Sequence, residues 1–185
     1  ITGGVNELRK ALEQYDYEMV IGSVPPVAGD STLTPLRAQA LKAMGRLSET
    51  LAEWNSLLPS DSTNTKVVIE LAECYRQMGN ARKAVECYRK AMEMQPLNKY
   101  FRLQCIRTLL NAEEYEEAKT VCHEWLDMDT TSATGYKYLG QAYEGLVGKD
   151  EQALSYAFIS YNAAYRRDSL DAQTVARIAN IFNNN

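Results

Sequence analysis

A 34-residue period limits what this chain can fold into more than any other feature of its sequence. Gly45 and Gly79 are separated by 34 residues, and so are the aromatic residues Trp54 and Tyr88. Self-similarity at a fixed period of about 20–50 residues is typical of arrays in which each unit packs mainly on its neighbours. The sequence therefore predicts a row of similar units rather than one irregular globule.

The segment 65–98 shows the unit most clearly and predicts two amphipathic helices joined by a tight turn. Gly79 and Asn80 interrupt the helical pattern, since both tolerate the positive φ that a helix C-terminus requires. Pro96 ends the second helix. On both sides of the turn, small and apolar residues recur at helical spacing: Leu71, Ala72 and Tyr75, then Ala84, Tyr88 and Ala91.

This unit resembles the tetratricopeptide repeat, whose pattern is W-x2-L-G-x2-Y, then A-x3-F and a proline. Val68, Ala72 and Tyr88 stand where that pattern has Trp, Gly and Phe. The later segment 133–170 restores most of it, with Tyr136, Leu139, Gly140 and Tyr143 in the first helix, then Ala157 and Tyr161.

The resemblance implies an all-α fold, a right-handed superhelical solenoid of antiparallel helix pairs with five hairpins and one terminal helix. It also implies a single domain over residues 1–185. The expected units cover residues 5–30, 31–64, 65–98, 99–132 and 133–170, with a partial unit at 171–185.

The two ends of the sequence depart from the repeat. Asn6 is predicted to N-cap a first, irregular hairpin that Pro25 and Pro26 terminate. In unit 31–64, Pro59 is expected to close the second helix. The last unit shows only a first helix, with the stripe Val175, Ile178, Ala179 and Phe182. Because Ile1 is not a methionine and this helix has no partner, we expect the sequence to be a segment of a longer chain.

Composition excludes several classes of protein. The 185 residues, 45% of them hydrophobic, can bury a substantial core. A net charge of −4 without a basic run argues against nucleic acid as the partner. No apolar run approaches the roughly 20 residues that a membrane span needs. The cysteines form no C-x-x-C pair and are interpreted as reduced core thiols, which leaves cytoplasmic and exported (periplasmic) locations both open: Cys74, Cys87, Cys105 and Cys122.

No catalytic or metal-binding pattern is present, so neither an enzyme nor a cofactor is expected. His123 is the single histidine, and its neighbours Cys122 and Glu124 point to different sides of a helix. A nucleophile and its base must face each other, which these residues do not. The acidic run Glu113–Glu117 is interpreted as a solvated helix face.

The resemblance further implies a concave groove lined by first helices, which binds a protein or peptide. Applying the repeat spacing to the groove positions of the family gives these partner-binding candidates: Glu73, Arg76, Gln77, Arg107, Asn111, Lys137, Gln141 and Asn180. Gln39, Lys42 and Asn184 stand at the same register. Some relatives clamp a terminal carboxylate with a Lys-x3-Asn pair. That clamp is not predicted, because the corresponding pairs are Ile69/Glu73, Leu103/Arg107 and Lys137/Gln141.

The inner charges favour an acidic partner. Five basic and two acidic residues occupy the inner faces of the first helices: Lys42, Lys66, Arg76, Arg107 and Lys137 against Glu73 and Glu144. A concave surface of one sign attracts a partner of the other. The predicted function is a non-catalytic interaction scaffold. The alternatives are a ligand-sensing or substrate-presenting module for a downstream domain and, less favoured, a glycan-binding protein that uses Tyr100.

Overall fold

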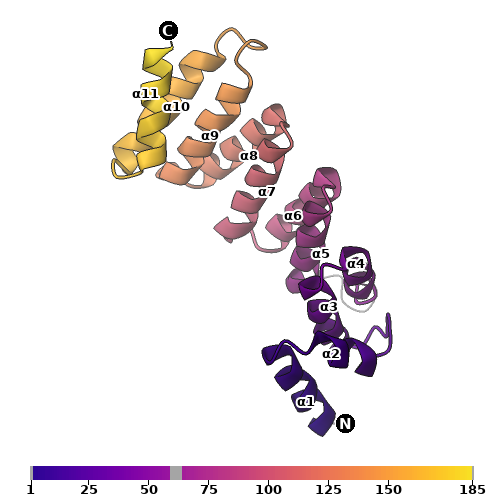
Figure 1. Cartoon of the computed structure of the whole chain (residues 1–185). Helices are drawn as coiled ribbons and strands as arrows, with labels where there is room; N and C mark the ends of the chain where they lie inside the picture. The colour runs from indigo at the N-terminus through magenta and orange to yellow at the C-terminus, as the bar shows by residue number, and fades with distance from the viewer. Residues whose placement is uncertain (1, 59–63, 185) are drawn as a thin grey trace. The chain divides into compact units, whose positions relative to one another are not determined.

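The computed structural model describes residues 2–58 and 64–184, and these form eleven α-helices (Figure 1). The chain divides into two compact units, Ile1–Leu97 and Asn98–Asn185. Unit 1 contains α1 (Thr2–Glu13), α2 (Tyr17–Ser23), α3 (Leu33–Ala43), α4 (Leu47–Asn55), α5 (Thr65–Gln77) and α6 (Ala81–Met94). Unit 2 contains α7 (Lys99–Asn111), α8 (Tyr115–Met128), α9 (Ala133–Gly145), α10 (Ala153–Arg167) and α11 (Ala172–Asn183).

These helices confirm the predicted all-α fold of five hairpins and one further helix. From residue 33 onward the helices follow one another as α3–α4, α5–α6, α7–α8 and α9–α10, and α11 is the last helix among the described residues. The expectation of a single domain over residues 1–185 stays a prediction. Pro59, expected to close the second helix of its unit, lies outside the described residues.

The turns inside the hairpins need a residue with positive φ, and the glycines provide it where they are present. Gly45 and Gly79 have φ angles of 74° and 77°. Asn80 does not share this role, because its φ is −90° and its side chain caps α6 by accepting a hydrogen bond from the Lys83 amide. Where glycine is missing, Tyr15 and Glu113 take the same conformation, with φ angles of 62° and 59°.

The first hairpin begins earlier than the sequence indicated. Asn6 was predicted to N-cap the first helix, which was wrong, because α1 already starts at Thr2 and Asn6 lies inside it. Asp16 caps the short α2 by accepting a hydrogen bond from the Met19 amide.

A buried ion pair connects the irregular segment after α2 to α3 and α4. The Arg37 side chain on α3 is only 7% exposed and donates from Nε to Oε1 of Glu53 on α4 at 2.9 Å. Arg37 also donates to the carbonyls of Ile21 and Val24, and the Val27 amide donates to Glu53. This ion pair connects three segments of backbone, although Oε2 of Glu53 is buried without a hydrogen-bond partner among the described residues.

In unit 2, hairpin α9–α10 packs closely because of one glycine. A Cβ built on Gly140 would lie 2.6 Å from Cε1 of Tyr161, so the buried tyrosine ring occupies the space that a side chain would need. Asp171 caps α11 by accepting a hydrogen bond from the Gln173 amide.

The stripe expected on α11 is only partly buried. Thr174 is the buried residue of this helix, whereas Val175 and Phe182 are 43% and 66% exposed. The Phe182 ring instead packs edge-on against Phe158 of α10.

The four cysteines are free, as interpreted from the sequence. Cys74, Cys105 and Cys122 are buried, and Cys87 is half-buried. Burial raises the pKa of the Cys122 thiol to about 12. Among residues 2–58 and 64–184, no helix has the length and apolarity to cross a membrane, and no group of histidine, cysteine or carboxylate side chains is arranged to hold a metal ion.

Candidate functional site

The predicted groove residues of unit 1 bind mainly to one another. The Arg76 guanidinium contacts the Glu73 carboxylate at 2.6 Å, and the Tyr88 hydroxyl donates to the same carboxylate at 2.7 Å. Burial raises the pKa of Glu73, but these two hydrogen bonds outweigh burial and leave the pKa below its ordinary value. Glu73 and Arg76 therefore largely neutralise each other's charge within the hairpin.

The remaining candidates of unit 1 do not converge on a site. Lys42 pairs with Glu70 of α5 at 3.2 Å. Gln39 and Gln77 are exposed on α3 and α5. This part of the predicted groove is polar, and ion pairs neutralise Lys42, Glu73 and Arg76.

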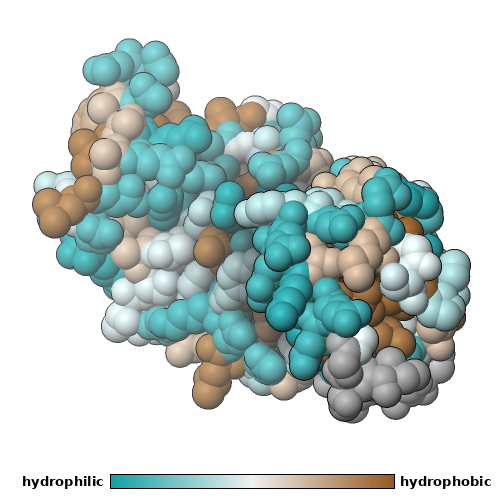
Figure 2. Space-filling view, turned by 60° about the horizontal axis from the view of Figure 1, so that its bottom comes forward, coloured by the Kyte–Doolittle hydropathy of each residue, from teal (hydrophilic) through white to brown (hydrophobic). Residues whose placement is uncertain are grey.

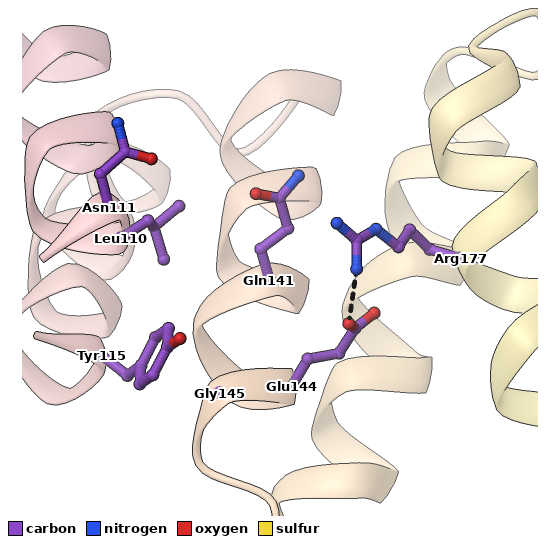
Figure 3. A pocket seen from close by; sticks show the side chains of 7 residues that line it. All are labelled: Leu110, Asn111, Tyr115, Gln141, Glu144, Gly145 and Arg177. Carbon is purple, nitrogen blue, oxygen red and sulfur yellow. Dashed lines mark hydrogen bonds and ion pairs between the residues drawn. The ribbon is translucent and has the colours of Figure 1, made fainter. Parts of the chain in front are cut away.

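Unit 2 has a recess across its first helices α7, α9 and α11, with a volume of about 350 Å³. Figure 3 shows side chains from α7 and α8 on one side of α9, and Arg177 extending toward α9 from the other side. The lining residues are Leu110, Asn111, Tyr115, Gln141, Glu144, Gly145 and Arg177.

Two of the predicted site residues meet here. Asn111 and Gln141 come from successive first helices and line the same recess. Arg107, Lys137 and Asn180 are not among its lining residues. Two of these three are exposed, and the half-buried Lys137 pairs with Asp171 at 3.1 Å. The structure therefore brings together the two amides but not the three others.

Three further residues give the recess its chemistry. Arg177 of α11 donates to the Glu144 carboxylate of α9 at 2.9 Å (Figure 3). The Tyr115 ring packs on Gly145, where a Cβ would lie only 2.3 Å from the ring. Glu144 was counted among the inner charges, but Arg177 and Tyr115 were not identified from the sequence.

The repeat spacing explains why Arg177 was missed. Matching Val175 to Tyr136 aligns Ala176 with the groove position Lys137 and puts Arg177 one residue past it. A long side chain reaches sideways from such a position, since its head can lie several ångström from its Cα. The useful signal would have been a long charged residue beside a groove position.

Ion pairing removes much of the basic surplus that the sequence indicated. Lys42, Arg76 and Lys137 each have a carboxylate partner within 3.2 Å. Among the described residues, Arg107 forms no ion pair and is exposed. The carboxylates of Glu70 and Asp171 were outside the inner set counted from the sequence.

Exposed apolar residues are dispersed on the face seen in Figure 2, where separate brown patches lie among teal polar residues. The polar recess of unit 2 is therefore a better candidate for a binding site than the separate apolar patches on that face.

Comparison with known proteins identifies the repeat. The family model described as tetratricopeptide repeat matches residues 36–184, which is most of the chain. The chain belongs to the tetratricopeptide repeat family. No curated protein matches it significantly.

Solved structures of tetratricopeptide repeat proteins share the fold at low sequence identity. MamA (residues 41 to the end) from Desulfovibrio magneticus RS-1 has a TM-score of 0.63 and 19% identity, over 80% of this chain and 81% of that one. The first repeat domain of Spaghetti (RPAP3), bound to the HSP90 peptide SRMEEVD, has a TM-score of 0.55 and 19% identity, over 67% and 94%. The first repeat domain of human RPAP3 has a TM-score of 0.55 and 18% identity, over 64% and 90%.

Proposed function

We propose that this chain is a non-catalytic scaffold whose unit 2 holds an extended segment of a partner protein across α7, α9 and α11. The observation that carries this proposal is the recess in which Asn111 and Gln141 meet. A primary amide donates and accepts hydrogen bonds, so amides from successive helices suit the repeating N–H and C=O groups of an extended peptide.

The fold supports a peptide as the occupant. The RPAP3 repeat domain, which is bound to the HSP90 peptide SRMEEVD, has the same helical-hairpin architecture. Tetratricopeptide repeats in that structure hold a peptide of seven residues, which is the kind of ligand proposed for this chain.

An acidic segment is the favoured partner of unit 2. Arg107 is exposed and has no ion pair among residues 64–184, and Arg177 is 40% exposed and donates from Nη1 to Glu144. Lys137 contributes less than its sequence position indicated, because Asp171 already neutralises it. Binding should weaken as salt is added, since exposed charges are screened within about 8–10 Å at ordinary ionic strength.

Peptide display on the whole chain tests the proposal. Peptides selected from a random displayed library should lose affinity for the double variant Asn111→Ala, Gln141→Ala. They should bind the control Asn55→Ala, Gln152→Ala as they bind the parent, because both control residues are exposed and lie outside the recess. Equal binding to the two double variants would remove the groove of unit 2 as the binding surface.

The acidic preference is tested with the same peptides. Arg107→Ala should weaken those that contain Asp or Glu several-fold, and added salt should reduce the difference between this variant and the parent. Selected peptides without enrichment in acidic residues would contradict the preference and leave the groove itself unaffected.

A further inference from the structure

The short turn between α10 and α11 presents a serine to solvent (Figure 1). Ser169 lies between Asp168, the C-cap of α10, and Asp171, the N-cap of α11. Ser169 is exposed, and its hydroxyl forms no hydrogen bond with the described residues. The Leu170 amide donates to Oδ1 of Asp168 at 3.2 Å, so the turn is shaped without using Ser169. The hydroxyl is therefore accessible to an enzyme.

The residues on both sides of Ser169 do little for the fold. Arg166 and Arg167 precede it by three and two residues, and Leu170 follows it directly. Leu170 is 92% exposed, the highest value among the large apolar residues of the described chain. Apolar surface stabilises a fold only when it is buried, so this leucine contributes almost nothing to stability. The segment 166–170 thus presents two cations, a hydroxyl and an apolar side chain on one exposed stretch.

Two arginines before a serine and an apolar residue after it form the pattern that basophilic serine kinases recognise. Carboxylates of such an enzyme bind the guanidinium groups, whose planar donors match them, and an apolar pocket takes the residue after the serine. Ser48 provides a comparison within the chain. It is also exposed, but only Arg46 precedes it and the acidic Glu49 follows. The pattern is complete at Ser169 and incomplete at Ser48.

The end of α10 can unwind to fit an enzyme that binds its substrate as an extended segment. Ala164 is the last buried residue of α10, and residues 165–167 after it are exposed. Unwinding them would leave the core of the hairpin in place. It would break two surface contacts of Arg167, the hydrogen bond to the Ala163 carbonyl and the stacking 4.3 Å from the centre of the Tyr136 ring. Helix ends with few buried contacts open readily.

We propose that Ser169 is a phosphorylation site for a serine kinase that recognises basic residues before the serine and an apolar residue after it. The kinase transfers the γ-phosphoryl group of a nucleoside triphosphate to Oγ of Ser169. The bond between the γ-phosphorus and the oxygen shared with the β-phosphate breaks, and the Oγ–P bond forms. The hydroxyl proton passes to a carboxylate of the kinase, and the nucleoside diphosphate leaves.

A phosphate on Ser169 changes the charge beside the predicted groove. Lys137 stands at a groove position and pairs with Asp171 at 3.1 Å, so the turn lies next to that position. The turn and its pairing partner hold three cations and two carboxylates: Arg166, Arg167 and Lys137, with Asp168 and Asp171. A phosphoserine adds about −1.5 to −2 at pH 7, which makes this group of charges negative. This consequence rests on the proposed function, because the added charge repels an acidic partner segment.

The test incubates the folded whole chain with ATP and the catalytic subunit of cAMP-dependent protein kinase, a kinase of this class. Peptide mass spectrometry measures the phosphate on each serine over time. Ser169 should be phosphorylated at least about ten-fold faster than Ser48, because Ser48 lacks the second arginine and the apolar residue. A rate at Ser169 no higher than at Ser48, or no phosphate on Ser169, would overturn the proposal.

Variants separate the sequence pattern from exposure alone. Arg166→Ala and Leu170→Ala should each lower the rate at Ser169 about ten-fold, since each removes one recognised side chain. Both residues are exposed, so circular dichroism should show a fold like that of the parent. The control Gln173→Ala changes an exposed residue outside the pattern and should leave the rate unchanged. Parent-like rates in both pattern variants would overturn the proposed recognition.

The effect on the groove is measured separately, so the two failures are distinguishable. The phosphorylated chain should bind acidic displayed peptides several-fold more weakly than the same chain after phosphatase treatment. If Ser169 is phosphorylated and binding does not change, the modification site holds and its effect on the groove is wrong. If Ser169 is not phosphorylated and displayed peptides still depend on Asn111 and Gln141, the site is wrong and the groove function holds.

Discussion

Hairpins α5–α6 and α9–α10 carry a buried tyrosine at the same register, and they treat its hydroxyl differently. In α5–α6, Tyr88 donates to Glu73, which Arg76 also contacts, so all three polar groups are satisfied within one hairpin. In α9–α10, the Glu144 carboxylate pairs with Arg177 of α11 at 2.9 Å and also lies near the Tyr161 hydroxyl, whose pKa it raises. The carboxylate near this tyrosine can therefore pair with an arginine of its own helix, as in α5, or with one of the next first helix, as in α9.

Unit 1 also has the buried ion pair between Arg37 and Glu53, and breaking it should have the largest effect on stability. Glu53→Gln leaves the Arg37 charge buried without a counter-charge, which should cost about 3 kcal/mol in the free energy of unfolding. Urea unfolding followed by circular dichroism measures the loss. Glu49→Gln is the matched control, because its pair with Arg46 is exposed and is screened by solvent, so its loss should change stability little. Equal losses would mean that the buried network does not fasten unit 1.

The tyrosines give the sharpest form of the comparison. Tyr88→Phe removes a hydrogen bond to a carboxylate and should cost about 1.5 kcal/mol. Tyr161→Phe removes a hydroxyl that makes no comparably short hydrogen bond, although the Glu144 carboxylate lies near it, and should cost less, about 0.5 kcal/mol. The two variants delete the same atom from the same register, so urea unfolding of both measures the difference directly. Similar losses in both would show that Tyr161 has a partner in solution.

Low pH should weaken the hydrogen-bond network that Glu73 forms with Arg76 and Tyr88 in α5–α6. The pKa of Glu73 is lowered on folding, so its stabilisation is present above the unfolded-state value and is lost as the pH falls through the lower folded value. Thermal unfolding of the parent should therefore show an acid-dependent loss that is smaller in Glu73→Gln. Gln77→Ala alters an exposed neighbour and should keep the parent's pH dependence. Parallel curves for the parent and Glu73→Gln would contradict this role.

The turns should give the smallest effect. Glu113 takes in unit 2 the positive φ that Gly79 takes in unit 1. Glu113→Gly relieves this strain and should stabilise the protein by about 0.5 kcal/mol after the entropy cost of glycine. Glu116→Gly places the same change inside α8 and should destabilise by about 1 kcal/mol. Differential scanning calorimetry of both variants resolves the opposite signs.

The sequence was sufficient to predict the hairpins, because their apolar spacing and turn glycines are local properties. Gly45 and Gly79 have the expected conformation, and Tyr88 is buried as its register required. The N-terminus of α1 was less predictable, since Asn6 is a good cap in a segment that simply continues as helix.

The candidate site could be predicted only in part, because it depends on how neighbouring helices are rotated. Asn111 and Gln141 follow from the repeat spacing, and the structure places both in one recess. The partners of Lys42 and Lys137 lie on the next first helix or at its cap, and small rotations decide whether such pairs form. Arg177 reaches the recess from a position beside the groove register, which spacing alone does not reveal.

Arg37 links α2 to α3, and the strength of this link depends on temperature. The cost of keeping charged groups out of water falls on heating, because their hydration becomes less favourable. The apolar contacts between Val20, Val24 and Leu36 weaken on cooling, as hydrophobic stabilisation does in general. Both trends make the attachment of the first hairpin weaker at low temperature than at moderately high temperature. Cold, rather than moderate warmth, is therefore the condition under which α2 is expected to detach from α3 and α4.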